Sequence, residues 1–293
     1  MAINTTSPSG IFVDQTFIAG EVVPEALIMT AATQVGSIEG DAPAIRCPFI
    51  KADPNTGFVP EGAEIGLDDP TLDEVLIRTA KIAVLTKVSR EADSYTTADT
   101  LIADSLARTI TNYANTAFLT NVPDSKHNTP VGLLNLPDIP DAGVLGADLD
   151  TLVDALAGIE AEGGQANMII VDPFGWAAVR KLKAATQSHL PLVGAAQEQA
   201  TQQLLGVPVI VNPKMSKGTA LVLDTREVLA AVGPINLDVS DQAFFSSDSI
   251  ARRVTWRIGW NVIRPERLAK LPIPLAPQTE PEPLTSEQDE TKD

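Results

Sequence analysis

Few residues of this chain have the type and spacing that catalysis needs. The two histidines, His127 and His189, stand in proline-flanked loop regions, with no cluster of partners at metal-ligand spacing. The single cysteine, Cys47, excludes an internal disulfide and a thiolate metal cage, and its apolar surroundings favour a buried thiol over a nucleophile. Phosphate-binding glycine loops, the dinucleotide-binding glycine motif and the Gly-x-Ser-x-Gly elbow are absent. The sequence therefore favours a protein that is not an enzyme and uses no cofactor or metal.

The charged residues are instead gathered in groups that suit contact surfaces. Acids are concentrated in a segment broken by proline and glycine: Glu61, Glu64, Asp68, Asp69, Asp73 and Glu74. Pairs such as Asp68–Asp69 can bind a divalent ion through carboxylate oxygens, but the turn residues around them favour a solvated or interface role. The trio Arg180, Lys181 and Lys183 is typical of a solvated helix face, with a surface for an acidic partner as the alternative.

Composition limits the partners of the protein. The formal net charge of −17 disfavours specific nucleic-acid binding, because such a surface repels phosphate backbones. Acids and prolines predict a disordered tail over 276–293. No run approaches the roughly 18 to 20 apolar residues that span a bilayer, and residues 1–10 lack the pattern of a signal peptide. We therefore expect a protein that begins in a cytoplasm and has no membrane partner.

The element that carries the acids is unusually long. A strand over 45–50 leads into the turn residues 53–57, and an alternating strand covers 74–88. Roughly two dozen residues with little apolar content lie between these strands, and a compact domain rarely carries so long a structureless loop without a use for it. The excursion over 48–88 is therefore expected to rest on another subunit.

The rest of the chain changes from helical to α/β periodicity. Apolar residues from Ala98 to Ala117 recur mostly three or four apart, which predicts a helix of about 25 residues ending near Asn121, long against the average of about 11 to 12. Asp172 and Pro173 suit the N-cap and first position of a further helix. The α/β elements comprise helices over 148–161 and 173–185, and strands over 167–171, 207–211, 220–223 and 235–239. A final strand over 250–263 is predicted at about 14 residues, where about 5 to 6 is usual.

The order of these elements and several short motifs resemble the major capsid proteins of tailed bacteriophages, of the Hong Kong 97 type. The resemblance covers about 58–268 and rests on six motifs in the family's order. They are the acidic loop with the long strand that ends at Lys87-Val88-Ser89-Arg90-Glu91, and the segments Thr129–Leu134, Met168–Lys183, Leu204–Val209, Gly218–Asp224 and Ile263–Pro265.

The resemblance implies an α+β capsid fold and a division of the chain. Its parts are an N-terminal arm (1–47), an extended loop (48–88), a peripheral domain with a long spine helix and long strands (89–129 and 234–275), an α/β axial domain (130–233) and the acidic tail (276–293). Its implied function is an icosahedral shell of pentamers and hexamers around double-stranded DNA, contacted non-specifically. The implied location is the virion, after assembly in the host cytoplasm, and the implied partners are other copies of the chain, a portal and a decoration protein.

Two departures from the family pattern refine this expectation. Because the arm starts at once, we expect a separate scaffold protein or none. Some relatives join subunits covalently through a lysine on the extended loop, but here no lysine or arginine occurs between Ala52 and Ile77. A shell without cross-links is therefore expected.

The acids of the loop are expected to face a basic surface of the neighbouring subunit. Candidate bases are Arg252, Arg253, Arg257, Arg264 and Arg267. Exposed ion pairs contribute only about 0 to 1 kcal/mol each, so these pairs should set register and assembly rate while apolar burial supplies the affinity. Two alternatives stay open: an encapsulin, which is a cellular nanocompartment with the same fold, and a soluble α/β enzyme with an unrecognised site.

Overall fold

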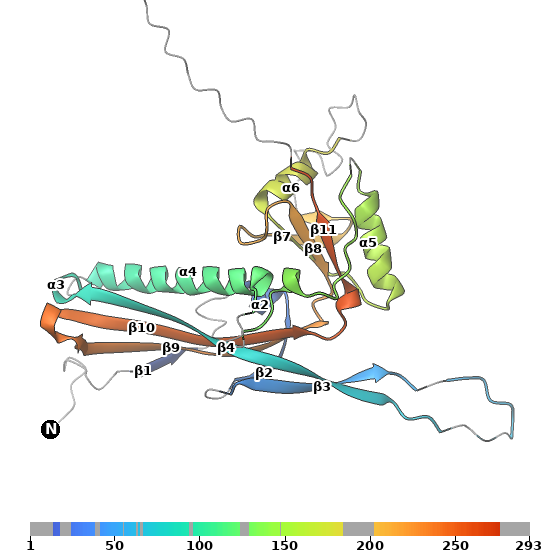
Figure 1. Ribbon diagram of the computed structural model, residues 1–293, viewed down its shortest axis with the longest axis horizontal. Helices are drawn as coiled ribbons and strands as arrows, with labels where there is room; N and C mark the ends of the chain where they lie inside the picture. The colour runs from blue at the N-terminus through green and yellow to red at the C-terminus, as the bar shows by residue number, and fades with distance from the viewer. Residues whose placement is uncertain are drawn as a thin grey trace, which may run out of the picture.

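The computed structural model describes residues 14–17, 25–38, 42–54, 56–62, 64, 67–93, 96–123, 129–146, 148–183 and 202–275. The chain forms two sheets. Figure 1 shows a long sheet at one level of the molecule and a smaller unit above one of its ends. His127, His189 and the predicted tail lie outside the described residues.

The long sheet has six strands in the order β1-β9-β10-β4-β3, with β2 parallel to β9. Its two longest strands, β4 and β9, have 19 and 17 residues. Its members are β1 (Asp14–Phe17), β2 (Thr33–Ser37), β3 (Ala44–Ala52), β4 (Thr71–Ser89), β9 (Val228–Phe244) and β10 (Ser249–Val262). The predicted strands over 45–50, 74–88 and 250–263 are therefore confirmed, whereas β9 begins seven positions before the predicted 235.

One face of the long sheet is covered by α4 (Thr96–Thr120), the helix predicted at about 25 residues and found at 25 (Figure 1). Phe118 is fully buried and meets the ring of Trp260 edge-on at a centroid distance of 5.4 Å. The indole N–H of Trp260 donates to the carbonyl of Val131 at 2.7 Å. The helix is preceded by α3 (Arg90–Asp93), and the short α2 (Leu27–Thr30) joins the same core, where the Leu27 amide donates to Asn115 Oδ1 at 2.8 Å.

The smaller unit has a five-stranded sheet in the order β11-β8-β5-β7-β6. The strands are β5 (Met168–Val171), β6 (Gln203–Leu204), β7 (Val207–Val211), β8 (Thr219–Leu223) and β11 (Leu268–Pro272). The helices are α5 (Asp150–Ala161) and α6 (Pro173–Arg180), with the 3-10 turns η1 (Leu133–Asn135), η2 (Phe245–Ser247) and η3 (Pro265–Arg267) elsewhere in the chain. Asp172 caps α6 as predicted, and its carboxylate accepts from the amides of Phe174 and Gly175 at 3.0 and 3.1 Å.

Three elements depart from the sequence-based expectation. The helix expected to run to 185 ends at Arg180, because the amide of Leu182 donates back to the carbonyl of Val179 and the Leu182 side chain packs into the apolar core of the smaller unit. The strand β2 lies within 1–47, the range expected to be an N-terminal arm, and no strand was predicted there. The strand β11 falls within 234–275, the range expected to share the spine helix, yet it pairs with β8 in the smaller sheet.

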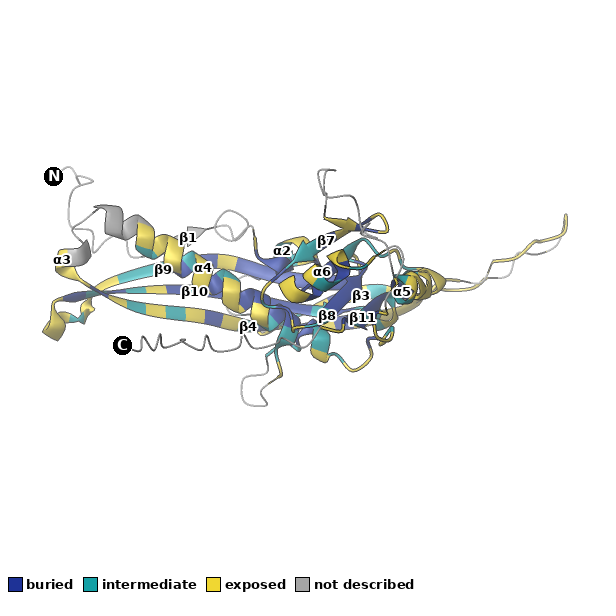
Figure 2. Ribbon diagram, turned by 90° about the horizontal axis from the view of Figure 1, so that it is seen from above, coloured by how far each residue is buried: buried dark blue, intermediate teal, exposed yellow. Residues whose placement is uncertain are grey.

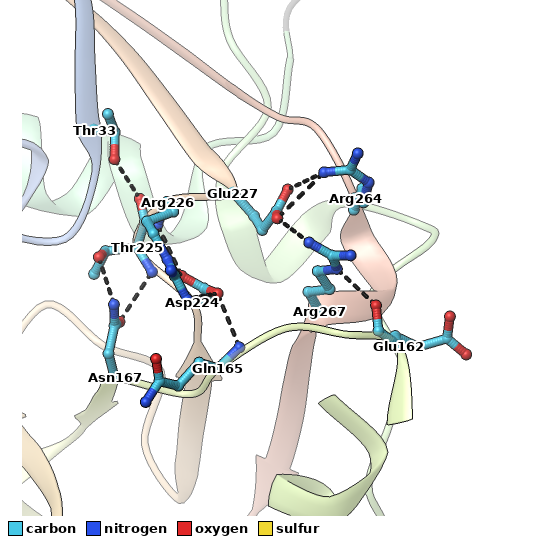
Figure 3. A network of polar contacts seen from close by, with 10 residues as sticks. All are labelled: Thr33, Glu162, Gln165, Asn167, Asp224, Thr225, Arg226, Glu227, Arg264 and Arg267. Carbon is cyan, nitrogen blue, oxygen red and sulfur yellow. Dashed lines mark hydrogen bonds and ion pairs between the residues drawn. The ribbon is translucent and has the colours of Figure 1, made fainter. Parts of the chain in front are cut away.

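A buried polar junction joins the two sheets and the β3–β4 hairpin. Figure 3 shows its central part, in which Arg264 and Arg267 converge on Glu227. Glu227, at the start of β9, is 5% exposed, and its carboxylate accepts from Arg267 Nη1 at 2.6 Å and from Arg264 Nη1 at 3.4 Å. Arg264 Nη2 also donates to the carbonyl of Ile50 in β3 at 2.7 Å, and Arg267 Nε donates to the carbonyl of Glu162 after α5 at 2.9 Å. One carboxylate and two guanidinium groups therefore connect four segments of the chain.

A second buried carboxylate stabilises the turn that enters β9. Asp224 is 1% exposed, and its side chain accepts from Arg226 Nε at 3.1 Å and from the amide of Gln165 at 2.9 Å. Burial alone would raise the pKa of Asp224, but hydrogen bonds from the Arg226 side chain and from the amides of Gln165 and Arg226 outweigh it. They hold the pKa of Asp224 below its ordinary value.

Replacement of Glu227 by glutamine should destabilise the dissociated subunit by about 2–4 kcal/mol, because two partly buried guanidinium groups lose their counter-charge. Urea unfolding monitored by tryptophan fluorescence measures the change. Glu266→Gln, which neutralises an exposed acid of η3, is the matched control and should change the unfolding free energy by less than about 0.5 kcal/mol. Equal effects of the two variants would contradict the structural role of the junction.

The lowered pKa of Asp224 predicts a pH dependence of stability. A carboxyl group whose pKa is lower in the folded chain stabilises the fold above its unfolded pKa of about 3.9, and this contribution is lost as pH falls through the folded pKa. The stability difference between wild type and Asp224→Asn should therefore be constant from about pH 5 to 7 and shrink below about pH 4. Urea midpoints across this range test it, and a gap that stays constant to the acid limit would refute the assignment.

Candidate assembly surfaces

The β3–β4 hairpin projects from the body of the molecule (Figures 1 and 2). The two strands pair from Ala44 opposite Arg78 to Ala52 opposite Thr71. At the base of the hairpin, Cys47, Val75 and Ile77 are buried against Ile38, whereas every described residue from 50 to 74 is exposed. The loop therefore has no apolar core of its own.

The predicted acids divide into two groups in the hairpin. Asp73 and Glu74 pair within it: Lys51 Nζ lies 3.4 Å from an Asp73 oxygen, and Arg46 Nη1 lies 2.5 Å from an oxygen of Glu74. The pKa of Asp73 is lowered, chiefly by the hydrogen bond from the Glu74 amide and also by the Lys51 ammonium group. The other four acids lie on the exposed loop between the strands: Glu61, Glu64, Asp68 and Asp69.

The same loop exposes large apolar side chains. Phe58 is 109% exposed and Leu67 is 93% exposed, relative to their reference states. An isolated exposed apolar residue is normal in a soluble protein. Phe58 and Leu67, however, lie on the same acidic loop, which has no apolar core. Together they provide apolar surface that a neighbouring molecule can bury.

The predicted bases are not gathered on one surface. Arg264 and Arg267 belong to the internal junction with Glu227. The strand register places Arg252 on the same face of β10 as Val254 and Trp256, which is the face that packs beneath α4. Only Arg253 and Arg257 lie on the opposite face, where they share a cavity of about 380 Å³.

Two lysines join this second face, and sequence reasoning did not single them out as part of a basic surface. Lys81 lines the cavity and lies opposite Arg257, and Lys87 stands six residues further along β4 on the same side. Arg253 forms an ion pair with Asp238 across the cavity at 2.5 Å. The signal that finds this group is the strand register, because all of its members occupy odd positions of β4 and β10. We call Lys81, Lys87, Arg253 and Arg257 the cationic face.

The described residues offer little for other chemistry. They contain no group of three or more His, Cys, Asp or Glu side chains placed to hold a metal ion. Burial raises the pKa of the Cys47 thiol, which disfavours the reactive thiolate. Within the described part of the chain, no helix is long and apolar enough to cross a membrane.

Comparison with known proteins identifies the fold and the family. The model of the phage capsid family matches residues 13–273, while a search of curated proteins gave no match. Among solved structures, the capsid of an empty GTA particle is similar at a TM-score of 0.68 and 20% identity, over 85% of this chain and 89% of that chain. A chain of Gordonia phage Cozz has a TM-score of 0.68 at 16% identity, over 86% and 87% of the two chains. A chain of Microbacterium phage Oxtober96 has a TM-score of 0.69 at 16% identity, over 85% of this chain and 91% of that chain.

These structural likenesses establish a mixed helix-and-sheet fold similar to that of phage capsid subunits, and the family match covers most of the chain. The resemblance that the sequence motifs predicted is thereby confirmed. This chain belongs to the phage capsid family and is a structural protein of the major capsid type.

Proposed function

We propose that this chain builds the icosahedral shell of a tailed phage, as pentamers and hexamers that enclose the double-stranded DNA genome. The observation that carries the proposal is the β3–β4 hairpin, whose acidic loop is exposed along its whole described length and has no core of its own. A loop of this length is typical of a functional segment, and we infer that a neighbouring molecule covers it. The shell would form in the host cytoplasm and end in the virion.

We assign the domains of the capsid fold to the parts of the two sheets as follows. The hairpin serves as the extended loop, and α4 with β9 and β10 serves as the peripheral domain with its spine helix. The five-stranded sheet with α5 and α6 serves as the axial domain around the capsomer axis, and β11 joins it. The strands β1 and β2 act as the arm, because they pair with the outer edge of β9.

The acidic loop of one subunit should lie over the cationic face of its neighbour. Glu61, Glu64, Asp68 and Asp69 lie on the loop, and the cavity among Lys81, Arg253 and Arg257 offers them positive charge. Arg264 and Arg267 are half-buried in the junction with Glu227, so the intersubunit role is proposed for the exposed acids of the loop and for the cationic face. Packaged DNA, a scaffold protein, a portal and a decoration protein complete the expected set of partners.

Electron microscopy of the expressed chain tests the shell directly, and closed particles of uniform diameter are expected. Membership of the phage capsid family supports a viral shell over the encapsulin alternative. A cargo enzyme enclosed in the particles instead of DNA would favour the nanocompartment. A chain that stays monomeric at concentrations at which capsid subunits assemble would overturn the proposal and reopen the enzyme alternative.

Reversal of Asp68 and Asp69 to lysine should impair shell assembly, because the loop would then repel the cationic face. The subunit should still fold, since both residues are exposed. Particle yield by sedimentation and unfolding of the unassembled chain measure the two effects. Addition of Lys81→Glu and Arg257→Glu to the reversed loop provides the matched control and should restore particles. Normal shells from the loop variant alone would contradict the charge pairing.

Assembled shells should dissociate into single chains of 31.0 kDa on a denaturing gel. Lysine is absent from the loop between Ala52 and Ile77, and the nearest flanking lysine, Lys51, pairs with Asp73 at 3.4 Å. The gel should show one band for intact particles, with or without reducing agent. A ladder of higher-mass bands that resists reduction would show covalent links and refute this expectation.

A further inference from the structure

The second half of β4, which follows Thr79 and leads to α3, has an open sheet edge on the side away from β10. In antiparallel pairing, the N–H and C=O groups of successive residues point alternately to the two sides of a strand. The amide of Thr79 donates to Pro43 at 3.0 Å, on the side away from β10, and β3 begins one residue later at Ala44. The β4–β10 register has no irregularity from Ser249 to Gly259. Odd-numbered residues beyond Thr79 therefore direct their backbone groups to the side away from β10.

Among the described residues, no strand lies on that side of Ala83, Leu85 and Lys87. The three residues are exposed, and Leu85 keeps 61% of its surface in the absence of a neighbour. An open edge of this length that also carries an apolar side chain is a ready template for another strand. The opposite edge of the sheet differs, because β1 and β2 cover β9 from Leu229 to Asp238.

Charge indicates which strand this edge can accept. Lys81 and Lys87 flank Leu85 on the same face, with Arg253 directly opposite Leu85 in β10. Lysines on an edge disfavour pairing with a second copy of the same edge and favour an acidic strand. The chain itself carries an acidic segment that could add such a strand: Leu67, Asp68 and Asp69 are separated from β4 by Pro70 and belong to no described strand.

We propose that the outer edge of β4 pairs with residues 67–69 of a neighbouring copy, which add a strand to the long sheet by backbone hydrogen bonds. The inference rests on the proposed shell and specifies how the loop is held. With Leu67 opposite Leu85, Asp69 falls opposite Ala83 and diagonal to Lys81 in antiparallel pairing, and opposite Lys87 in parallel pairing. Either direction joins apolar to apolar and acid to base. The contact cannot form within one subunit, since Leu67 and Leu85 are separated by most of β4, roughly 45 Å.

Backbone pairing predicts slower amide exchange in the wild-type particle. Hydrogen exchange should be at least about 10-fold slower in assembled shells than in dissociated subunits at Leu85, together with Ala83 if the pairing is antiparallel or Lys87 if it is parallel. Val84, whose backbone already faces β10, is the internal reference and should change much less. Equal exchange at the three odd positions in both states would overturn the inference, even if shells form normally.

Disulfide trapping identifies the strand that occupies the edge. In a Cys47→Ala background, Leu67→Cys with Leu85→Cys should give covalent multimers when assembled shells are mildly oxidised, because paired strands bring Cα atoms within disulfide reach. Leu67→Cys with Val153→Cys, which uses an exposed site on α5, is the matched control and should stay monomeric. Shells that form but give no multimers would overturn the inference while leaving the proposed function intact. Disulfide-linked dimers from Leu85→Cys alone would overturn the inference, because they would show that the β4 edges of two copies pair with each other.

Discussion

The buried carboxylate of Glu227 is the constraint on which the arrangement of the subunit depends. It lies where β8 passes into β9, so it belongs to the point at which the chain leaves one sheet for the other. Arg264 and Arg267 approach it from the return crossing between β10 and β11. Two of the three crossings between the sheets, β8 to β9 and β10 to β11, are therefore held at one site, while the crossing from β4 to β5 runs through α4 and α5. A rotation of one sheet against the other would separate a buried carboxylate from its guanidinium partners.

The same site determines where the hairpin begins. Arg264 reaches past Glu227 to the carbonyl of Ile50, and its guanidinium group lies 5.7 Å from the ring centre of Phe49. These contacts fix β3 just before it becomes fully exposed. Beyond Ile50, the only strand pairing is that of Ala52 with Thr71, and the ion pair between Lys51 and Asp73 is exposed and contributes about 0 to 1 kcal/mol. The base of the hairpin is thus rigid, while its loop depends on whatever covers it.

Sequence reasoning identified the elements with strong local signals. The alternation of Val75, Ile77 and Thr79 and the Asp172-Pro173 cap depend on neighbouring residues alone, and both appear in the structure as predicted. The strand β9 was underestimated because residues 228–232 are buried on both faces and show no alternation. Charge partners were hardest to predict. Arg264 and Arg267 resemble the surface arginines of β10 in sequence, and only the three-dimensional path of the chain brings them to Glu227.

The two kinds of basic residue suit the two kinds of contact. A guanidinium group offers several donors in one plane, and Arg264 and Arg267 each use theirs on a carboxylate and a backbone carbonyl together. An ammonium group is a strongly hydrated point charge on a flexible stem. On the open edge of β4 that property would suit the proposed contact, because a lysine can follow an acidic neighbour through small changes of angle between subunits. In the proposed shell, fixed geometry inside the subunit and adjustable charge at its edge would together let one rigid fold meet neighbours that are not identically placed.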